Sequence, residues 1–308
     1  MHLPTEKFVS PKCLCLGNAI AAALIFSSAG AYAQEAARNT FAITPVYQIT
    51  GDLDSGGDAD YAGVFTSIGR RWDLDSRATI GLRLSFDYED WHFHDIAAFD
   101  GVQPWNQLFR AGITVPYSYT TDGGWRLTFS PTLEFSGESG ANFSDALEYG
   151  ALVSGARRFG PDLTLGLGVG VYERIEQTRA FPFLIIDWRI TDRLRLTNPL
   201  PAGPAGPAGL ELSYALGSGW EIGIAGAFRS FRFRLDEKGP VPSGIGENEY
   251  IPVVARIGRE LSDSLTFNFY AGVALAGNLR VEDRNGNGLY DEDRDPAGLI
   301  GLSLIGRF

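Results

Sequence analysis

Apolar and polar residues alternate with a period of two along most of the chain. In 80–88, 125–135 and 163–171, one parity carries almost only apolar side chains, and the other carries glycine or polar residues. Successive side chains of a β-strand point to opposite faces, so this pattern predicts strands with one apolar face. The chain also ends in this way, because "LIGLSLIGRF" alternates up to Phe308.

The alternating segments predict about fourteen strands. Their expected ranges are 39–49, 60–72, 77–89, 105–119, 124–136, 146–158, 162–174, 179–190, 193–198, 208–216, 220–235, 249–260, 264–281 and 298–308.

The connections between these strands alternate in kind. Links such as "TTDGG", "FGPD" and "GSG" are tight turns, whereas "GDLDSGGDAD", "PLPAGPAGPAG" and "DEKGPVPSGIGEN" are long and polar. Only "IEQ" near residue 176 is short where a long loop is expected. Short turns at one end, long loops at the other and an even strand count predict a single antiparallel transmembrane β-barrel with both termini periplasmic.

Aromatic residues near strand ends agree with this fold, because interfacial aromatic girdles flank the apolar band of such barrels. The residues expected there are Trp72, Trp105, Tyr117, Tyr119, Trp125, Trp188 and Trp220.

Residues 1–33 predict a secretory signal peptide, and residues 34–308 form the expected barrel. Two lysines precede a short apolar run, and a small-x-small cleavage pattern ends at Ala33. A membrane-spanning helix needs about 20 apolar residues, and no later stretch is long enough. Both cysteines fall within the signal peptide, so we expect no disulfide in the exported domain.

The amino-acid composition limits the classes of binding partner. The formal net charge is −11, which argues against nucleic acid because nucleic-acid binding needs a basic patch. The 38 Gly, 20 Phe and 12 Tyr favour strands and tight turns. The predicted signal peptide and transmembrane barrel give the expected location, which is the outer membrane, in contact with lipid and lipopolysaccharide.

The ending resembles the C-terminal signature of bacterial outer-membrane β-barrel proteins, which stop at a terminal Phe. That resemblance implies that the barrel-assembly machinery recognises this strand through Phe308. Three further stretches, "FLIIDWRITDRLRLTNP", "FRSFRFRLD" and "VEDRNGNG", resemble an outer-membrane family known only as a domain of unknown function. That resemblance implies a fold and no activity.

If the apolar parity faces lipid, charges of both signs face the lumen. The expected lumen residues are Arg83, Asp87, Arg110, Arg126, Glu134, Asp187, Arg189, Arg193, Arg195, Arg256 and Glu260. Rings of charged side chains set selectivity in pores, so we expect a porin-like passage for small solutes. Arg189, Arg193 and Arg195 lie across one tight turn and should favour anions at the periplasmic mouth.

Two alternatives remain. One is a non-conducting surface protein whose long loops bind a partner or lipopolysaccharide. The other is an outer-membrane hydrolase that uses His92 or His94, which alternation places on one face beside Asp90 and Asp95. No Ser in a G-x-S-x-G setting accompanies them.

The loop at 283–295 resembles a calcium loop without flanking helices. The candidate ligands are Asp283, Asn285, Asn287, Leu289, Asp291 and Asp293. Oxygen ligands at alternate positions suit Ca²⁺, but Arg294 stands where the bidentate Glu of a calcium loop belongs. An acidic, glycine-rich surface hairpin is the alternative.

Overall fold

A computed structural model describes residues 39–198 and 209–308 of the chain. The predicted signal peptide at 1–33 and most of the "PAGPAGPAG" stretch lie outside the described residues. Within the two described ranges, no helix is long and apolar enough to cross a membrane.

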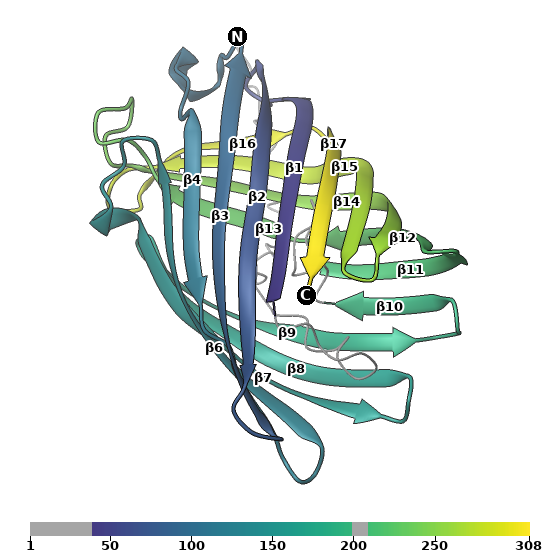
Figure 1. Cartoon of the computed structure of the whole chain (residues 1–308). Coiled ribbons are helices and arrows are strands. Elements are labelled where there is room, and N and C mark those ends of the chain that lie inside the picture. The colour runs from purple at the N-terminus through teal and green to yellow at the C-terminus, as the bar shows by residue number, and fades with distance from the viewer. Residues whose placement is uncertain (1–38, 199–208) are drawn as a thin grey trace, which may run out of the picture.

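The described residues form one antiparallel sheet of seventeen strand segments that closes on itself (Figure 1). The segments are β1 (Asn39–Asp52), β2 (Asp58–Asp73), β3 (Ala78–His94), β4 (Gln107–Thr114), β5 (Tyr117–Thr120), β6 (Trp125–Glu138), β7 (Leu147–Phe159), β8 (Leu163–Arg174), β9 (Gln177–Arg189), β10 (Leu194–Asn198), β11 (Gly209–Gly217), β12 (Trp220–Ala227), β13 (Arg229–Arg234), β14 (Ile245–Ser262), β15 (Leu265–Glu282), β16 (Gly288–Arg294) and β17 (Ala297–Arg307). Two short 3-10 helices, η2 (Ala98–Gly101) and η3 (Ser144–Ala146), lie in the loops.

These segments make fourteen wall strands, as predicted. Segments β4 and β5 share one position in the wall, β12 and β13 continue one another, and β16 extends β15 as an outer hairpin. The break between β4 and β5 falls at Pro116, which has no N–H to donate to the ladder. The expectation that 283–295 is all loop is wrong, because 288–294 pairs with β15.

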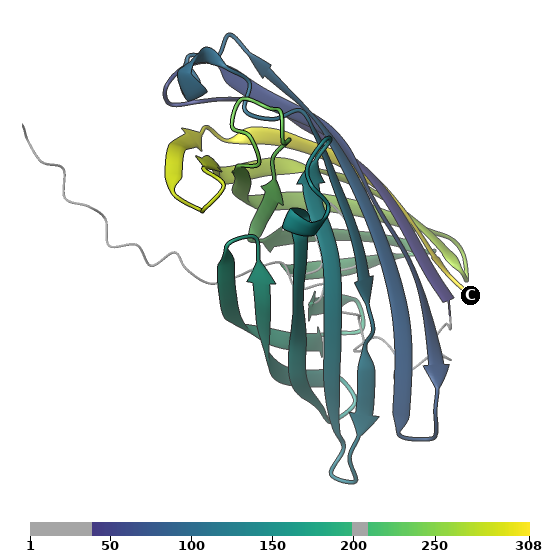
Figure 2. The ribbon, with the colours of Figure 1, turned by 90° about the vertical axis from the view of Figure 1, so that its left-hand side faces the viewer.

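The first and last strands close the barrel. Strand β1 pairs with β17 from Thr40 opposite Arg307 to Gln48 opposite Leu299. At the seam, the N–H of Asn39 donates to the carbonyl of Phe308 at 2.7 Å, and the N–H of Phe308 donates back at 3.0 Å. Figure 2 shows the same wall from the side, with the C-terminus at the end of the short turns.

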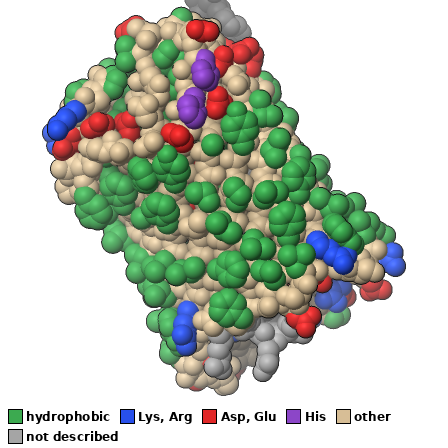
Figure 3. All heavy atoms as spheres, turned by 45° about the horizontal axis from the view of Figure 1, so that its top comes forward, with side chains coloured by type: hydrophobic (Ala, Val, Ile, Leu, Met, Phe, Trp, Pro, Cys, Tyr) green, Lys and Arg blue, Asp and Glu red, His purple; other side chains and the backbone are tan. Residues whose placement is uncertain are grey.

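The apolar parity faces outward. Exposed large apolar side chains such as Phe86, Phe129, Leu167 and Ile224 cover the outside, and they form a broad band in Figure 3. At the short-turn end, the exposed aromatic residues are Trp72, Tyr117, Tyr119, Trp125, Trp188 and Trp220, which are 37–42 % exposed. The same prediction is wrong for Trp105, which is 0 % exposed because it packs against Trp91 and Phe233 inside the extracellular end.

We predict that Gly272→Val impairs assembly of the barrel. Gly272 faces inward on β15, and a Cβ there would collide with the carbonyl oxygen of Val253 on the paired strand, where neither backbone can move. Overpacking of this kind costs about 1–3 kcal/mol. Heat-modifiable gel migration should show a smaller folded fraction. Ala271→Val, one residue away on the lipid-facing parity, is the control and should assemble normally.

Candidate functional site in the barrel lumen

Most of the predicted lumen residues lie on the inward parity of the wall. Those that are buried or half-buried are Arg83, Asp87, Arg110, Arg126, Glu134, Asp187, Arg195 and Arg256. Arg189, Arg193 and Glu260 are exposed at the periplasmic rim.

The strongest feature of the lumen is β13, which leaves the wall and folds inward. Strand β12 pairs with β11 up to Ala227, but β13 pairs along its length only with β14. Its far end reaches β6, where Arg234 forms a parallel bridge with Gly137, and the Ser136 hydroxyl donates to the carbonyl of Arg232 at 2.8 Å. All six residues of β13 are buried. The strand therefore divides the extracellular half of the lumen.

One face of β13 is charged and packs toward β7–β9. Arg232 is 3 % exposed and contacts Glu247 at 3.4 Å and Glu282 at 2.5 Å. Its Nε donates to the carbonyl of Ile175 at 2.7 Å, and Arg234 contacts Glu176 at 3.3 Å. The short "IEQ" connection between β8 and β9 is thus bound by the arginines of β13, which accounts for the exception in the loop pattern.

Further ion pairs extend this charged face across the lumen. Arg174 contacts Glu148 at 3.3 Å and donates to the hydroxyl of Ser230, which itself donates to Glu247 at 3.0 Å. Arg179 of β9 contacts Glu247 at 3.1 Å and Glu249 at 3.4 Å. We call the following set the β13 ion network: Glu148, Arg174, Arg179, Ser230, Arg232, Glu247, Glu249, Arg280 and Glu282.

The opposite face of β13 is apolar and packs toward β1–β4. Phe233 and Leu235 belong to a buried cluster that includes Trp91 and Trp105. Phe231 lies between two guanidinium groups, with Arg110 3.9 Å and Arg229 4.4 Å from its ring centroid.

Sequence reasoning missed the role of this segment. The alternation of Arg and Phe in "FRSFRFRLD" was visible, but it reads as one wall strand with a lipid face. A lipid-facing strand and an internal strand with two different packing faces share the same period of two.

A second buried pair, Arg256 with Glu211, lies in the wall itself. Arg256 of β14 contacts Glu211 of β11 at 2.5 Å, and it also pairs with Glu221 and with Asn268 at 2.9 Å. Deeper in the extracellular half, Arg110 contacts Glu89 at 2.7 Å. Burial of a guanidinium is costly unless a carboxylate accompanies it, and these pairs meet that requirement.

The three arginines near the β9–β10 turn are not a free cationic cluster. Arg195 binds Asp187 with two hydrogen bonds of 2.6 and 2.7 Å, and Arg189 lies 3.7 Å from Asp162. Arg193 is exposed on the turn. Carboxylates therefore neutralise two of the three charges on which the anion preference depends.

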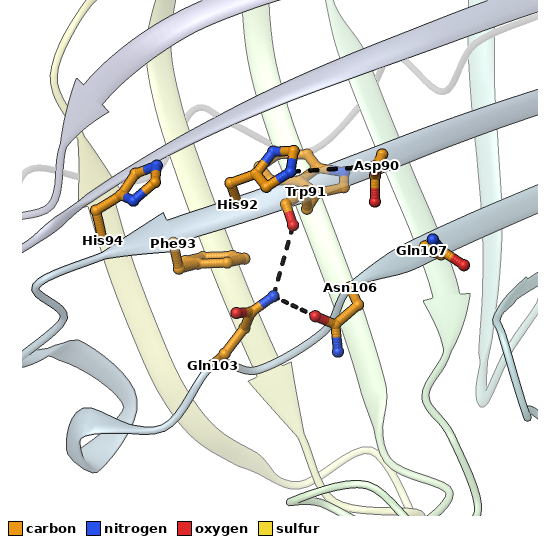
Figure 4. A pocket seen from close by; sticks show the side chains of 8 residues that line it. All are labelled: Asp90, Trp91, His92, Phe93, His94, Gln103, Asn106 and Gln107. Atoms are coloured by element: carbon orange, nitrogen blue, oxygen red, sulfur yellow. Dashed lines mark hydrogen bonds and ion pairs between the residues drawn. The ribbon is translucent and has the colours of Figure 1, made fainter.

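His92 and His94 lie at the extracellular end of β3 on the outer face, not in the lumen (Figures 3 and 4). Their rings stack with centroids 6.5 Å apart, and both approach the carboxylate of Asp60, at 3.5 Å and 3.2 Å. They line a pocket of about 460 Å³ with Asp90, Trp91, Phe93, Gln103, Asn106 and Gln107. No Ser, Thr or Cys is among these described lining residues, so the hydrolase alternative gains no nucleophile here.

The candidate calcium loop is a closed hairpin held by Asp283. Its carboxylate accepts the backbone N–H groups of Asn285 and Asn287 at 2.8 and 2.9 Å and the side-chain amide of Asn287 at 2.8 Å. The amide of Asn287 is the main cause of the lowered pKa of Asp283. Asp291 and Asp293 lie on β16, and both accept hydrogen bonds from Asn278. Leu289 is exposed.

Across residues 39–198 and 209–308, no group of three or more His, Cys, Asp or Glu side chains is arranged to hold a metal ion. Calcium binding at 283–295 stays a prediction.

A closed fourteen-strand barrel with an apolar outer band and a charged interior defines an outer-membrane β-barrel protein. The chain belongs to the family described as "Domain of unknown function (DUF6268)", whose profile matches residues 73–303. A search of curated protein sequences found no match.

Solved structures with a similar fold are outer-membrane barrels. The COG4313 outer membrane channel of Pseudomonas putida F1 aligns with a TM-score of 0.50 at 9 % identity, covering 90 % of this chain and 97 % of that one. A FadL homologue of Pseudomonas aeruginosa aligns with a TM-score of 0.45 at 12 % identity, covering 88 % and 90 %. The toluene transporter TodX of Pseudomonas putida gives 0.43 at 8 % identity, covering 90 % and 91 %. At these identities the likeness concerns the fold.

We predict that calcium at about 1 mM, the affinity range of extracellular calcium modules, slows proteolysis of the loop at 283–295. The double variant Asp283→Ala with Asn287→Ala removes two candidate ligands and should abolish that protection. Limited proteolysis of the folded barrel with calcium or with a chelator measures it. If calcium leaves cleavage of the unmutated loop unchanged, the hairpin is closed by the hydrogen bonds of Asp283 alone.

Proposed function

We propose that this protein is an outer-membrane channel for small polar solutes, and that β13 closes its extracellular half in the conformation described. The observation that carries the proposal is the position of β13, a strand inside the lumen whose charged face is held by ion pairs. The fold of outer-membrane channels supports the passage in general, and the solute is not specified by it.

The lining of the lumen supports a polar passage. Toward the periplasmic half, inward positions carry hydroxyl-bearing residues such as Ser67, Ser118, Thr128 and Ser154. The Ser118 and Thr128 hydroxyls are 2.9 Å apart, so this part of the wall offers donors and acceptors to a hydrated solute. Large apolar residues would be expected at these positions if the interior were a packed core.

The attachment of β13 suits a closure that can open. One edge is fixed by its ladder to β14. The other side is held by a single backbone bridge and the Ser136 hydroxyl on β6, by Arg174 of β8, and by the Ile175 carbonyl and the Glu176 carboxylate at the β8–β9 turn. Buried ion pairs depend steeply on geometry, because separated partners lose their attraction and keep their desolvation cost. A modest displacement of β13 would therefore release several contacts together.

Selectivity for anions is the finer part of this proposal. Arg193 is the most available of the three arginines that motivated it, because Arg189 and Arg195 each have a carboxylate partner. A weak anion preference, reduced by Arg193→Ala, is what this arrangement supports.

A non-conducting surface protein is the second candidate. The apolar face of β13 packs into a buried cluster with Trp91 and Trp105, which favours a permanent plug in the extracellular half. In that case the long outer loops would carry the function, by binding a partner or lipopolysaccharide.

We predict that the double variant Arg232→Gln with Glu247→Gln raises the open fraction of single channels in planar bilayers. It removes both members of the central pair, whereas removal of one member alone would leave a fully buried charge unpaired at a cost of about 3–5 kcal/mol. Arg179 and Arg280 keep Glu249, and only the partly exposed Glu282 loses its arginine. Single-channel recording of purified protein measures the effect, and the unmutated protein should show mostly closed, small-amplitude steps.

Arg256→Gln with Glu211→Gln is the matched control. This pair is equally buried but lies between wall strands, so its removal should leave the open fraction unchanged. Silence of correctly folded unmutated protein and of the β13 variant alike would contradict the channel and favour the surface protein.

A further inference from the structure

The outer face of the barrel carries three arginines at its periplasmic end. Arg70, Arg157 and Arg259 share the outward parity of the exposed residues Ile68, Val153 and Ile257 on β2, β7 and β14. They come from well-separated parts of the wall. The inward parity and the turns hold the other described arginines of this end.

Each of the three guanidinium groups lies over an exposed aromatic ring. Arg70 is 5.5 Å from the ring centroid of Trp72, and Arg157 is 5.9 Å from that of Phe159. Arg259 is 4.8 Å from the ring of Trp220, its cross-strand partner. These rings are 39 %, 50 % and 42 % exposed and belong to the boundary of the apolar band. The ring face attracts the cation and fixes its height at that boundary.

The three arginines lack a carboxylate partner, unlike several arginines near them. In the described parts of the chain, no ion pair involves Arg70, Arg157 or Arg259. Several other arginines of the same end have a carboxylate partner, as in Arg77 with Asp122, Arg189 with Asp162 and Arg195 with Asp187. Arg259 donates one hydrogen bond to the carbonyl of Ser218 at 2.7 Å, which leaves its other guanidinium N–H groups available to a ligand.

The outward strand positions at the two ends of the barrel differ in charge. At the periplasmic end, the described outward positions contain these arginines and neither Asp nor Glu. At the extracellular end they include Asp58, Asp60, Asp90 and Glu173 together with His92 and His94. Figure 3 shows the histidines and acidic side chains along the upper edge of the apolar band. The described outward strand positions of the periplasmic end are therefore cationic.

We propose that Arg70, Arg157 and Arg259, each with its aromatic ring, bind the phosphate groups of phospholipids in the periplasmic leaflet. A guanidinium edge matches a phosphate diester with two parallel N–H donors, and the adjoining apolar band holds the acyl chains at the same height. Phosphate at this depth supplies the counter-charge that the chain itself does not provide. The interaction concerns the outer surface and does not depend on conduction through the lumen.

The full chain in a non-ionic detergent, titrated with phosphatidylglycerol and measured by native mass spectrometry, tests the proposal. The triple variant Arg70→Gln, Arg157→Gln, Arg259→Gln should lower the apparent affinity for this phospholipid about tenfold, which corresponds to modest contributions from three contacts. Each single variant should lower it by a smaller factor, so the test does not depend on folding of the triple variant. A neutral galactolipid without phosphate should bind the variants and the unmutated protein equally.

The control is Arg77→Gln, Arg189→Gln, Arg193→Gln, which removes the same net charge from the turns. Heat-modifiable migration identifies the folded fraction of every variant. Equal phosphatidylglycerol affinity of unmutated protein and folded triple variant would overturn the proposal. An equal loss in the control variant would also overturn it, because net charge alone would then explain the binding.

Discussion

The pairing of every backbone N–H and C=O group inside the protein is the constraint on which this wall depends. Hydrocarbon offers no hydrogen bonds, and each unpaired group there costs several kcal/mol. An open fourteen-strand sheet would have two edge strands with unpaired backbone groups. The pairing of β1 with β17 removes them, and the reciprocal bonds between Asn39 and Phe308 extend the ladder to the end of the chain. Phe308 is thereby part of the seam.

Closure in turn decides where charges can lie. Once one parity of every strand faces lipid, the other parity has to share a confined interior, and burial of its arginines requires carboxylates close by. The β13 ion network and the Arg256–Glu211 pair are the two largest results of this requirement. The two have different consequences. The Arg256–Glu211 pair joins wall strands to each other, whereas the β13 ion network holds an internal strand against the wall.

The two sides of β13 in the interior therefore have different packing environments. On the side of β1–β4, β13 meets aromatic and aliphatic residues, which exclude water and fix the strand. On the side of β7–β9, it meets carboxylates and guanidinium groups, whose mutual attraction is lost when they separate. In the proposed channel, opening of the extracellular half would therefore require movement of this one strand rather than of a whole loop.

The pattern of residues along the chain was enough to predict the wall. Fourteen alternating segments, the alternation of short and long connections and the pattern of the last strand predicted the number of strands, the closed barrel and the side on which most wall residues lie, because a period of two depends only on local backbone geometry. The inward position of β13, the burial of Trp105, the outward position of His92 and His94 and the partners of Arg189 and Arg195 were decided by the tertiary structure. Each of these depends on which residues distant in sequence lie opposite one another across the barrel. A period of two shows which residues share a face of a strand, but it does not show whether that face contacts lipid, water or another part of the protein.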